Sequence, residues 1–262
     1  MPTWDPDQYL RFADHRLRPA ADLVARIPLS GPELIWDLGC GTGGPTLLLR
    51  RRWPEATINA LDSSAEMLEQ APPTEGIDWI RGDIAEWSPA EPPSLVFSNA
   101  ALHWVDDHVA LFPRLVGTLR PGGVLAVQMP RNHEEPSHVR LRETARSDRW
   151  RDRVAHLVRE APVLAPQRYH GILREHSASI DLWETVYLQA LIGRNAVAEW
   201  ARGSVLRPFL DVLGNEGDAF FADYASRLAD DHPAEPDGTT LFPFRRLFIV
   251  ATREGGRQGR GG

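Results

Sequence analysis

Short apolar runs and amphipathic segments alternate along the first 130 residues. The apolar runs at 34–37, 57–61, 78–81, 94–98 and 124–129 have the length of β-strands, and the segments that begin near Pro45, Ser64 and Phe112 have helical spacing. Turn residues such as Pro72-Pro73 and Pro121-Gly122-Gly123 separate the segments. Because strand and helix alternate with short turns, the pattern predicts a parallel, doubly wound α/β sheet.

The pattern changes after Pro130. Residues 137–158 are rich in Arg, His and Glu and predict an exposed helix, while 180–191 and 246–252 predict two last strands. Further short helices are predicted at 169–174, 195–200, 205–213 and 219–228. The expected fold is therefore a seven-stranded, mostly parallel sheet with helical cap insertions before its last two strands.

The first strand ends in a glycine-rich turn, which reads D-L-G-C-G-T-G from Asp37 to Gly43, and Pro45 then opens a helix. Glycine tolerates the positive φ of such a turn and lets a ligand approach bare backbone. The helix N-terminus beyond the turn offers unpaired N–H groups to a polar ligand. We therefore expect a nucleotide-like cofactor on this turn.

Two classes of enzyme use a turn of this kind. Gly39-x-Gly41-x-x-Gly44, with Asp62 closing the second apolar run, satisfies the dinucleotide fingerprint, so the glycines alone do not separate a nicotinamide or flavin enzyme from a methyltransferase. Asp37 stands two residues before the first glycine, where the dinucleotide fingerprint has an apolar residue. Together with Gly82-Asp83-Ile84 after the third strand, it favours the methyltransferase.

These expectations divide the chain as follows. A single domain covers 1–253, with a cofactor-binding core at 1–130, cap insertions at 131–179 and 192–240, and the last strands at 180–191 and 241–253. The caps would lie over the carboxyl ends of the strands, where ligands bind in open α/β sheets. The Gly/Arg tail at 254–262 is expected to be disordered.

Composition excludes several other functions. The net charge of −7 and the lack of a long basic stripe argue against nucleic-acid binding. All 29 basic residues are Arg, which excludes a Schiff-base or Walker-type lysine. Cys40 is the only cysteine, so disulfides within the chain and thiolate zinc sites are excluded. Since no signal peptide or apolar run of membrane length is visible, we expect a cytoplasmic protein without a membrane partner.

The chain resembles the class I S-adenosylmethionine-dependent methyltransferases. D-L-G-C-G-T-G, the acid at Asp62, G-D-I at 82–84 and N-A-A-L-H-W at 99–104 carry this resemblance. W-D-P-D-Q-Y-L-R-F, R-L-R-P, V-Q-M-P, L-R-P-F-L and R-R-L-F-I-V-A are similar to the members of the family that methylate a small tricarboxylate, trans-aconitate. His103 departs from relatives with Gln at this position, but a hydrogen-bonding side chain is retained.

The resemblance implies roles for residues around the turn. Asp62 would accept hydrogen bonds from the ribose hydroxyls, Asp83 would accept one from the adenine amino group, and the N–H of Ile84 would meet the adenine ring. Met67 and Trp87 either flank the adenine or belong to the core. The residues expected to bind S-adenosyl-L-methionine are Asp37, Gly39, Gly41, Gly43, Asp62, Ser63, Met67, Asp83, Ile84 and Asn99.

His103 and Trp104 are expected near the transferred methyl group, His103 as a positioning donor and Trp104 as a wall. A carboxylate is already ionised at neutral pH and needs no general base. Three carboxylates need fixed cations, and Arg pairs with them bidentately. The substrate-binding candidates are Tyr9, Arg16, Arg18, Gln128, Arg207, Arg245 and Arg246; for each arginine a surface ion pair is the alternative.

The resemblance leaves rival functions open. One is a methyltransferase for another small acid, such as a carrier-bound malonyl group, and another is a non-catalytic protein that binds S-adenosylmethionine. His133 and His138 lack metal-ligand spacing with acids, so no metal is expected. We expect a monomer or a weak homodimer.

Overall fold

The computed structural model describes residues 17–160 and 163–255, which form two compact units. Unit 1 takes in the described residues up to Pro130, Val163–Thr185 and those from Leu247 onward; unit 2 takes in 131–160 and Val186–Arg246. Two substrate candidates, Tyr9 and Arg16, lie outside the described residues, as do residues 256–262 of the tail.

One seven-stranded sheet has the strand order β3-β2-β1-β4-β5-β7-β6. Its strands are β1 (Leu34–Leu38), β2 (Thr57–Asp62), β3 (Ile77–Arg81), β4 (Leu95–Asn99), β5 (Val124–Pro130), β6 (Ser177–Ile192) and β7 (Thr239–Arg253). The first five are parallel. β7 runs antiparallel to β5, because Arg253 accepts from Gly122 and donates to the Gly123 carbonyl at 2.8 Å. The predicted α/β sheet is confirmed.

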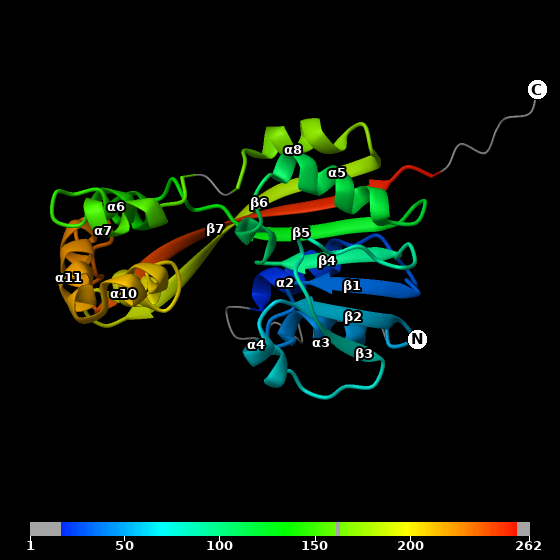
Figure 1. Cartoon of the computed structure of the whole chain (residues 1–262), viewed down its shortest axis with the longest axis horizontal. Coiled ribbons are helices and arrows are strands. Elements are labelled where there is room, and N and C mark those ends of the chain that lie inside the picture. The colour runs from blue at the N-terminus through cyan, green and yellow to red at the C-terminus, as the bar shows by residue number, and fades with distance from the viewer. Residues whose placement is uncertain (1–16, 161–162, 256–262) are drawn as a thin grey trace, which may run out of the picture. The chain divides into compact units, whose positions relative to one another are not determined.

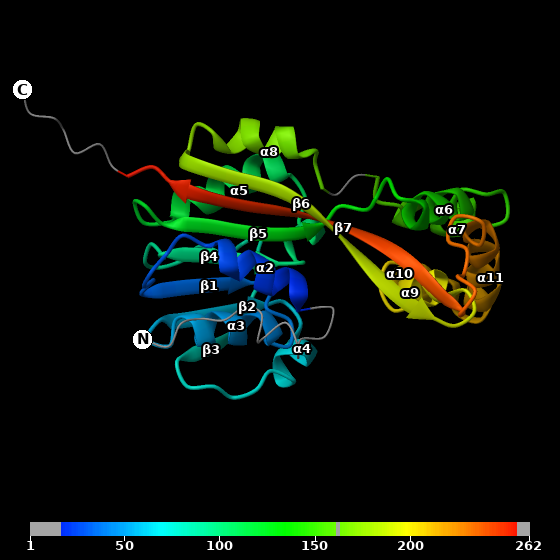
Figure 2. The same ribbon diagram turned by 180° about the vertical axis from the view of Figure 1, so that it is seen from behind.

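Helices cover both faces of the sheet in unit 1 (Figures 1 and 2). They are α2 (Arg18–Arg26), α3 (Gly44–Arg52), α4 (Ala65–Glu69), α5 (His108–Thr118) and α8 (Pro166–Leu173). α5 and α8 lie on the face turned to the viewer in Figure 1, whereas α2 and α3 face the viewer in Figure 2. Parallel strands covered in this way are buried on both faces, and all of Leu95–Ser98 and Val124–Met129 is buried.

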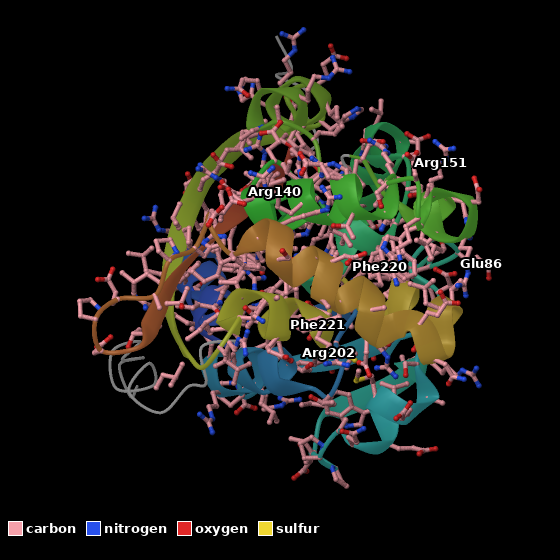
Figure 3. The ribbon with its side chains drawn as sticks, turned by 90° about the vertical axis from the view of Figure 1, so that its left-hand side faces the viewer. Glu86, Arg140, Arg151, Arg202, Phe220 and Phe221 are labelled. Carbon is pink, nitrogen blue, oxygen red and sulfur yellow. The ribbon has the colours of Figure 1, made fainter. Side chains whose placement is uncertain are left out.

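Unit 2 is built on helices and on the halves of β6 and β7 that belong to it. The helices are α6 (Pro136–Ala145), α7 (Arg151–Val154), α9 (Ala196–Arg202), α10 (Arg207–Leu213) and α11 (Gly217–Leu228). Figure 3 labels Phe220 and Phe221 on α11, and the Arg202 guanidinium carbon lies 4.7 Å from the centre of the Phe221 ring. The Phe220 ring stacks on Phe209 at 5.7 Å.

The structure corrects two boundaries in this half of the chain. Residues 137–158 are not an exposed helix, because Leu141, Trp150 and Val154 are buried in the core of unit 2. Residues 163–179, expected in a cap insertion, belong to unit 1, where α8 packs against α5 and the Phe112 and Tyr169 rings lie 4.8 Å apart.

Candidate functional site

The glycine-rich turn folds over the end of β2. The N–H groups of Gly39 and Cys40 both donate to the Leu61 carbonyl, at 2.7 and 3.1 Å. The Gly41 N–H donates to Asp62 Oδ2 at 2.8 Å. These bonds fix the turn against the strand that carries Asp62, so the predicted proximity of the glycines and this carboxylate is present.

The three glycines of the turn have positive φ but different surroundings. A Cβ at Gly39 would overlap the Ala101 Cβ, and one at Gly43 would overlap the Trp79 ring. A Cβ at Gly41 would meet nothing within 4 Å. Packing within the protein therefore requires glycine at Gly39 and Gly43. At Gly41 the space beside the backbone is open, and a ligand could approach there.

Asp62 is held by backbone on both oxygens. Its Oδ1 accepts from the Ser64 N–H at 2.9 Å, while Oδ2 accepts from Gly41. Ser64 caps α4 by accepting from the Met67 N–H at 3.2 Å. A carboxylate has about four lone-pair sites, so two held oxygens can still accept from a neighbouring pair of hydroxyl groups.

Asp37 is a buried acid with one unsatisfied oxygen. Its side chain is 1% exposed, Oδ2 accepts from the Thr46 hydroxyl at 2.6 Å, and Oδ1 has no hydrogen-bond partner among the described residues. Burial raises the pKa of Asp37 from 3.8 to about 7; the Thr46 hydrogen bond opposes this rise and Asp62 adds to it. The vacant acceptor favours a cationic donor.

Asn99 supplies a second vacant acceptor at the end of β4. Its buried Oδ1 also has no hydrogen-bond partner within the described residues. The next residue, Ala100, has a φ of 56° and donates its N–H to the Gln128 carbonyl at 2.8 Å. Non-glycine residues with positive φ are uncommon and cluster at functional sites.

A 3-10 turn, η1 (Leu102–Trp104), follows Ala100 and carries the two residues predicted near the methyl group. The His103 and Trp104 rings lie 4.8 Å apart with an interplanar angle of 41°. His103 is half-buried, whereas Trp104 is 60% exposed. Since Gly39 packs against Ala101, this turn lies beside the glycine-rich turn.

The turn after β3 carries the residues predicted to meet an adenine ring. Asp83 is exposed and its Oδ1 accepts from the Ala85 N–H at 2.8 Å. The Ile84 Cδ1 atom lies close to where a Gly39 Cβ would stand. Trp87 is buried edge-to-face against Trp36, so it belongs to the core, whereas Met67 is 44% exposed and Ser63 is exposed.

The described arginine candidates lie in different environments. Arg18 and Arg207 are exposed, and Arg207 lies 4.0 Å from Asp211, which is the surface ion pair considered as the alternative. Arg245 Nε donates to Glu135 at 3.3 Å. Arg246 is packed on the Phe244 ring at 4.3 Å, and burial lowers its pKa to about 10.

Gln128 is buried on β5 and pairs in register with Asn99. Since Tyr9 lies outside the described residues, Gln128 is the one neutral substrate candidate in the described part of the chain. Cys40 is also buried, which raises the pKa of its thiol and agrees with a packing role.

Sequence reasoning missed three side chains that shape these turns. Thr46 binds Asp37, and its signal was a polar residue directly before the three leucines of the helix. His108 and Arg114 on α5 bind backbone carbonyls of η1 and of the turn after β3. Their partners are carbonyl groups, which leave no mark in a sequence.

Two kinds of feature are missing from the described residues, a cluster of metal-binding side chains and a membrane-spanning helix. No group of three or more His, Cys, Asp or Glu residues there could hold a metal ion, and none of the helices there has the length and apolar character needed to span a membrane. The absence of a metal requirement stays a prediction.

Comparison with known proteins decides between the two classes of enzyme. Residues 35–123 match the family model of a methyltransferase domain. A trans-aconitate 2-methyltransferase of Azoarcus sp. (strain BH72) is 47% identical over 257 residues, which cover 97% of this chain and 100% of that protein. The chain belongs to the trans-aconitate 2-methyltransferase family. A relative of that name in Streptomyces avermitilis is 46% identical over 265 residues, covering 97% of this chain and 98% of the relative.

Solved structures agree with this family in fold. The YcgJ protein of Bacillus subtilis has a TM-score of 0.60 and 13% identity, covering 91% of this chain and 99% of that chain. Phosphoethanolamine N-methyltransferase 2 of Haemonchus contortus, in complex with S-adenosyl-L-methionine, has a TM-score of 0.52 and 16% identity, covering 90% of this chain and 52% of that one. At such identities the likeness concerns the fold alone. Membership of the trans-aconitate 2-methyltransferase family excludes the nicotinamide interpretation.

Proposed function

We propose that the chain transfers a methyl group from S-adenosyl-L-methionine to one carboxylate oxygen of trans-aconitate, which gives a monomethyl ester. The observation that carries this proposal is the 47% identity, over nearly the full length of both chains, to a trans-aconitate 2-methyltransferase. When bound, the cofactor supplies a methyl group on a positively charged sulfur, which is reactive without further activation.

The residues at the carboxyl ends of β1, β2 and β4 suit the cofactor. Asp37 and Asn99 each leave one buried oxygen without a hydrogen-bond donor among the described residues, and the methionine part of the cofactor carries an ammonium group. Asp62 is fixed by two backbone N–H groups and would accept from the ribose hydroxyls. The open backbone at Gly41 would let the cofactor lie against the turn.

The turn after β3 would take the adenine. Asp83 is exposed and would accept from the adenine amino group, with the Ile84 N–H donating to the ring. Met67 and Ser63 are exposed on the neighbouring segment that leads into α4, and Met67 would cover the ring face.

Methylation of a carboxylate needs alignment and dehydration more than proton transfer. The acceptor has a reference pKa near 4 and is ionised at neutral pH, so no general base is required. His103 would donate a hydrogen bond that orients the acceptor, and Trp104 would exclude water from it. Held in this way, the reacting oxygen keeps its negative charge until the new bond forms.

Arginines would hold the other carboxylates of the substrate. A guanidinium that gripped the reacting carboxylate would draw off the electron density needed for attack, so the arginines should bind the two carboxylates that do not react. The candidates are Arg16, Arg18, Arg207, Arg245 and Arg246, with Tyr9 and Gln128 as neutral partners. Among the described candidates, Arg246 is half-buried, with its guanidinium over the Phe244 ring.

The test is incubation of the protein with radiolabelled S-adenosylmethionine and a panel of free di- and tricarboxylic acids together with a carrier-bound malonyl group, scored for base-labile label. We expect trans-aconitate to be labelled. Labelling only of malonyl groups on a carrier would support the methyltransferase alternative. Binding of S-adenosylhomocysteine without labelling of any acid would support the non-catalytic alternative.

Single Arg→Ala changes test the substrate side. Loss of an anchoring arginine should lower kcat/KM for trans-aconitate by roughly a hundredfold or more, as expected for truncating one partner of a hydrogen-bonded charge pair. The affinity for S-adenosylhomocysteine should not change. If none of the five substitutions altered kcat/KM, the assignment of these arginines would be wrong.

The cytoplasmic location and the monomeric or weakly homodimeric state stay predictions.

A further inference from the structure

α5 carries two polar side chains that bind backbone carbonyls of two different turns. His108 is the first residue of the helix and is 5% exposed; its Nε2 lies 2.9 Å from the Leu102 carbonyl oxygen. Arg114 lies further along the helix and donates to the Trp87 carbonyl at 2.5 Å and to the Ile84 carbonyl at 2.9 Å. All of these residues belong to unit 1.

Tyr169 fixes the state of the His108 ring. The Tyr169 hydroxyl oxygen accepts from the Leu164 N–H at 3.1 Å, and the same oxygen lies 2.6 Å from His108 Nδ1. A hydroxyl that accepts one hydrogen bond can donate its own hydrogen to Nδ1. The neutral imidazole then carries its hydrogen on Nε2 and donates it to the Leu102 carbonyl. The Leu102 carbonyl can only accept, so it requires the hydrogen on Nε2, and the hydroxyl of the fully buried Tyr169 is the matching donor for Nδ1.

The segment that His108 holds is bounded by two residues in left-handed conformations. Ala100 has a φ of 56° and Asp107 has a φ of 50°. Left-handed backbone costs a residue with a Cβ about 1–2 kcal/mol, so such a segment needs tertiary contacts to keep its conformation. Between them the Leu102 carbonyl accepts from the Val105 N–H at 3.0 Å and lies within hydrogen-bond distance of His108, and His103 and Trp104 follow it directly.

Arg114 plays the corresponding part in the turn after β3. Its two carbonyl partners, Ile84 and Trp87, are also the two ends of one turn hydrogen bond, from the Trp87 N–H to the Ile84 carbonyl at 3.3 Å. One planar guanidinium thus spans the turn that begins next to Asp83. A lysine could donate from one nitrogen only and would not hold both carbonyls in the same geometry.

We propose that α5 is the positioning element of the cofactor site, with His108 and Tyr169 placing the turn of His103 and Trp104, and Arg114 placing the turn of Asp83 and Ile84. The proposal rests on the proposed function. These three are positioning residues, because they are proposed to act through the turns that they hold: His108 and Arg114 bind backbone carbonyls, and Tyr169 binds His108. Substitution of His108 or Tyr169 should therefore affect the acceptor half of the site, which carries His103 and Trp104. Substitution of Arg114 should affect the adenine half, which carries Asp83 and Ile84.

The Arg114→Gln variant tests the adenine half. We expect its dissociation constant for S-adenosylhomocysteine, measured by calorimetry, to rise about tenfold, while kcat at saturating cofactor changes less than threefold, since a lost bond to a charged donor is worth roughly that factor. Arg50→Gln is the matched control: Arg50 also donates to two carbonyls in unit 1, those of Pro54 and Gly76, which lie away from both turns. It should lower the melting temperature without changing this dissociation constant.

The Tyr169→Phe variant tests the acceptor half. We expect faster deuterium exchange in residues 100–107, unchanged exchange in β2, an unchanged dissociation constant for S-adenosylhomocysteine and a kcat about tenfold lower. His108→Leu should behave in the same way. His108→Gln, which keeps one donor and one acceptor, should restore most of kcat and slow the exchange again; it also covers the case in which Tyr169→Phe fails to fold.

The positioning role of α5 and the proposed function can be refuted independently of each other. If the Arg114 and Tyr169 variants lose only thermal stability, as Arg50→Gln does, α5 has no positioning role even though the wild type methylates trans-aconitate. If the wild type methylates no acid, the proposed function fails, whereas the exchange and calorimetric measurements still decide the role of α5.

Discussion

Replacing Asp37 with asparagine should make the protein without cofactor more stable at pH 8. Burial raises the pKa of this carboxyl from 3.8 to about 7, so between these values the folded protein holds a proton that the unfolded chain has lost. Stability therefore falls as the pH rises through this window and levels off above it. The asparagine side chain stays neutral throughout and can still accept from Thr46.

The size of the effect follows from the two pKa values. The difference between 3.8 and about 7, at about 1.4 kcal/mol per pKa unit, gives about 4 kcal/mol as an upper bound. Below pH 4 both proteins carry a neutral side chain at this position, and their stabilities should nearly coincide. The gap between the two proteins in the free energy of unfolding should then widen as the pH rises and reach its full size above pH 7.

Urea unfolding of both proteins from pH 4 to pH 8 measures this gap. Asp78→Asn, a change at an exposed position on β3, is the matched control and should show no such trend. At pH 8 calorimetry should also show at least tenfold weaker binding of S-adenosylhomocysteine to Asp37→Asn, since its ammonium group loses the proposed anionic partner. A gap that stays constant with pH, or tighter binding by the variant, would refute the reasoning.

Four further substitutions separate stability from binding. Gly43→Ala should destabilise the protein by about 1–3 kcal/mol in urea unfolding, because its Cβ would overlap the Trp79 ring. Gly41→Ala has open space and should cost only about 1–2 kcal/mol of backbone strain, with its larger effect on cofactor affinity by calorimetry. Asp62→Asn should weaken S-adenosylhomocysteine binding about tenfold, because its amide nitrogen cannot accept from an N–H group or a hydroxyl. Phe220→Ala should cost about 3–5 kcal/mol of stability, because it empties the stacked core of unit 2, and should leave calorimetric affinity for the cofactor unchanged.

The first five strands could be predicted because buried parallel strands appear in a sequence as nearly unbroken apolar runs. The last strand was harder. β7 begins at Thr239, but Pro243 interrupts the apolar residues before the recognisable run at 246–252. Proline lowers the expectation of a strand, so the apolar pattern predicts a strand only over 246–252, within the segment 241–253 assigned to the last strand.

The positions of candidate side chains in a known motif were predictable, as for Asp37 and Asp62 at the ends of β1 and β2. A contact was not predictable where the partner is a backbone carbonyl. Arg114 reaches carbonyls 27 and 30 positions earlier in the chain, and no residue type at those positions indicates it. In the same way, the six arginines between 140 and 153 suggested an exposed helix and concealed the buried positions between them.

The arginines that hold carbonyls give the lysine-free composition a structural meaning. Arg50, Arg52, Arg114 and Arg253 each donate to two backbone oxygens, of which at least one belongs to a distant segment. A guanidinium keeps its proton at neutral pH, and its fork reaches two acceptors that a single ammonium nitrogen would have to share. Wholesale exchange of arginine for lysine would thus preserve the net charge of this molecule and still cut the cross-links between its helices and loops.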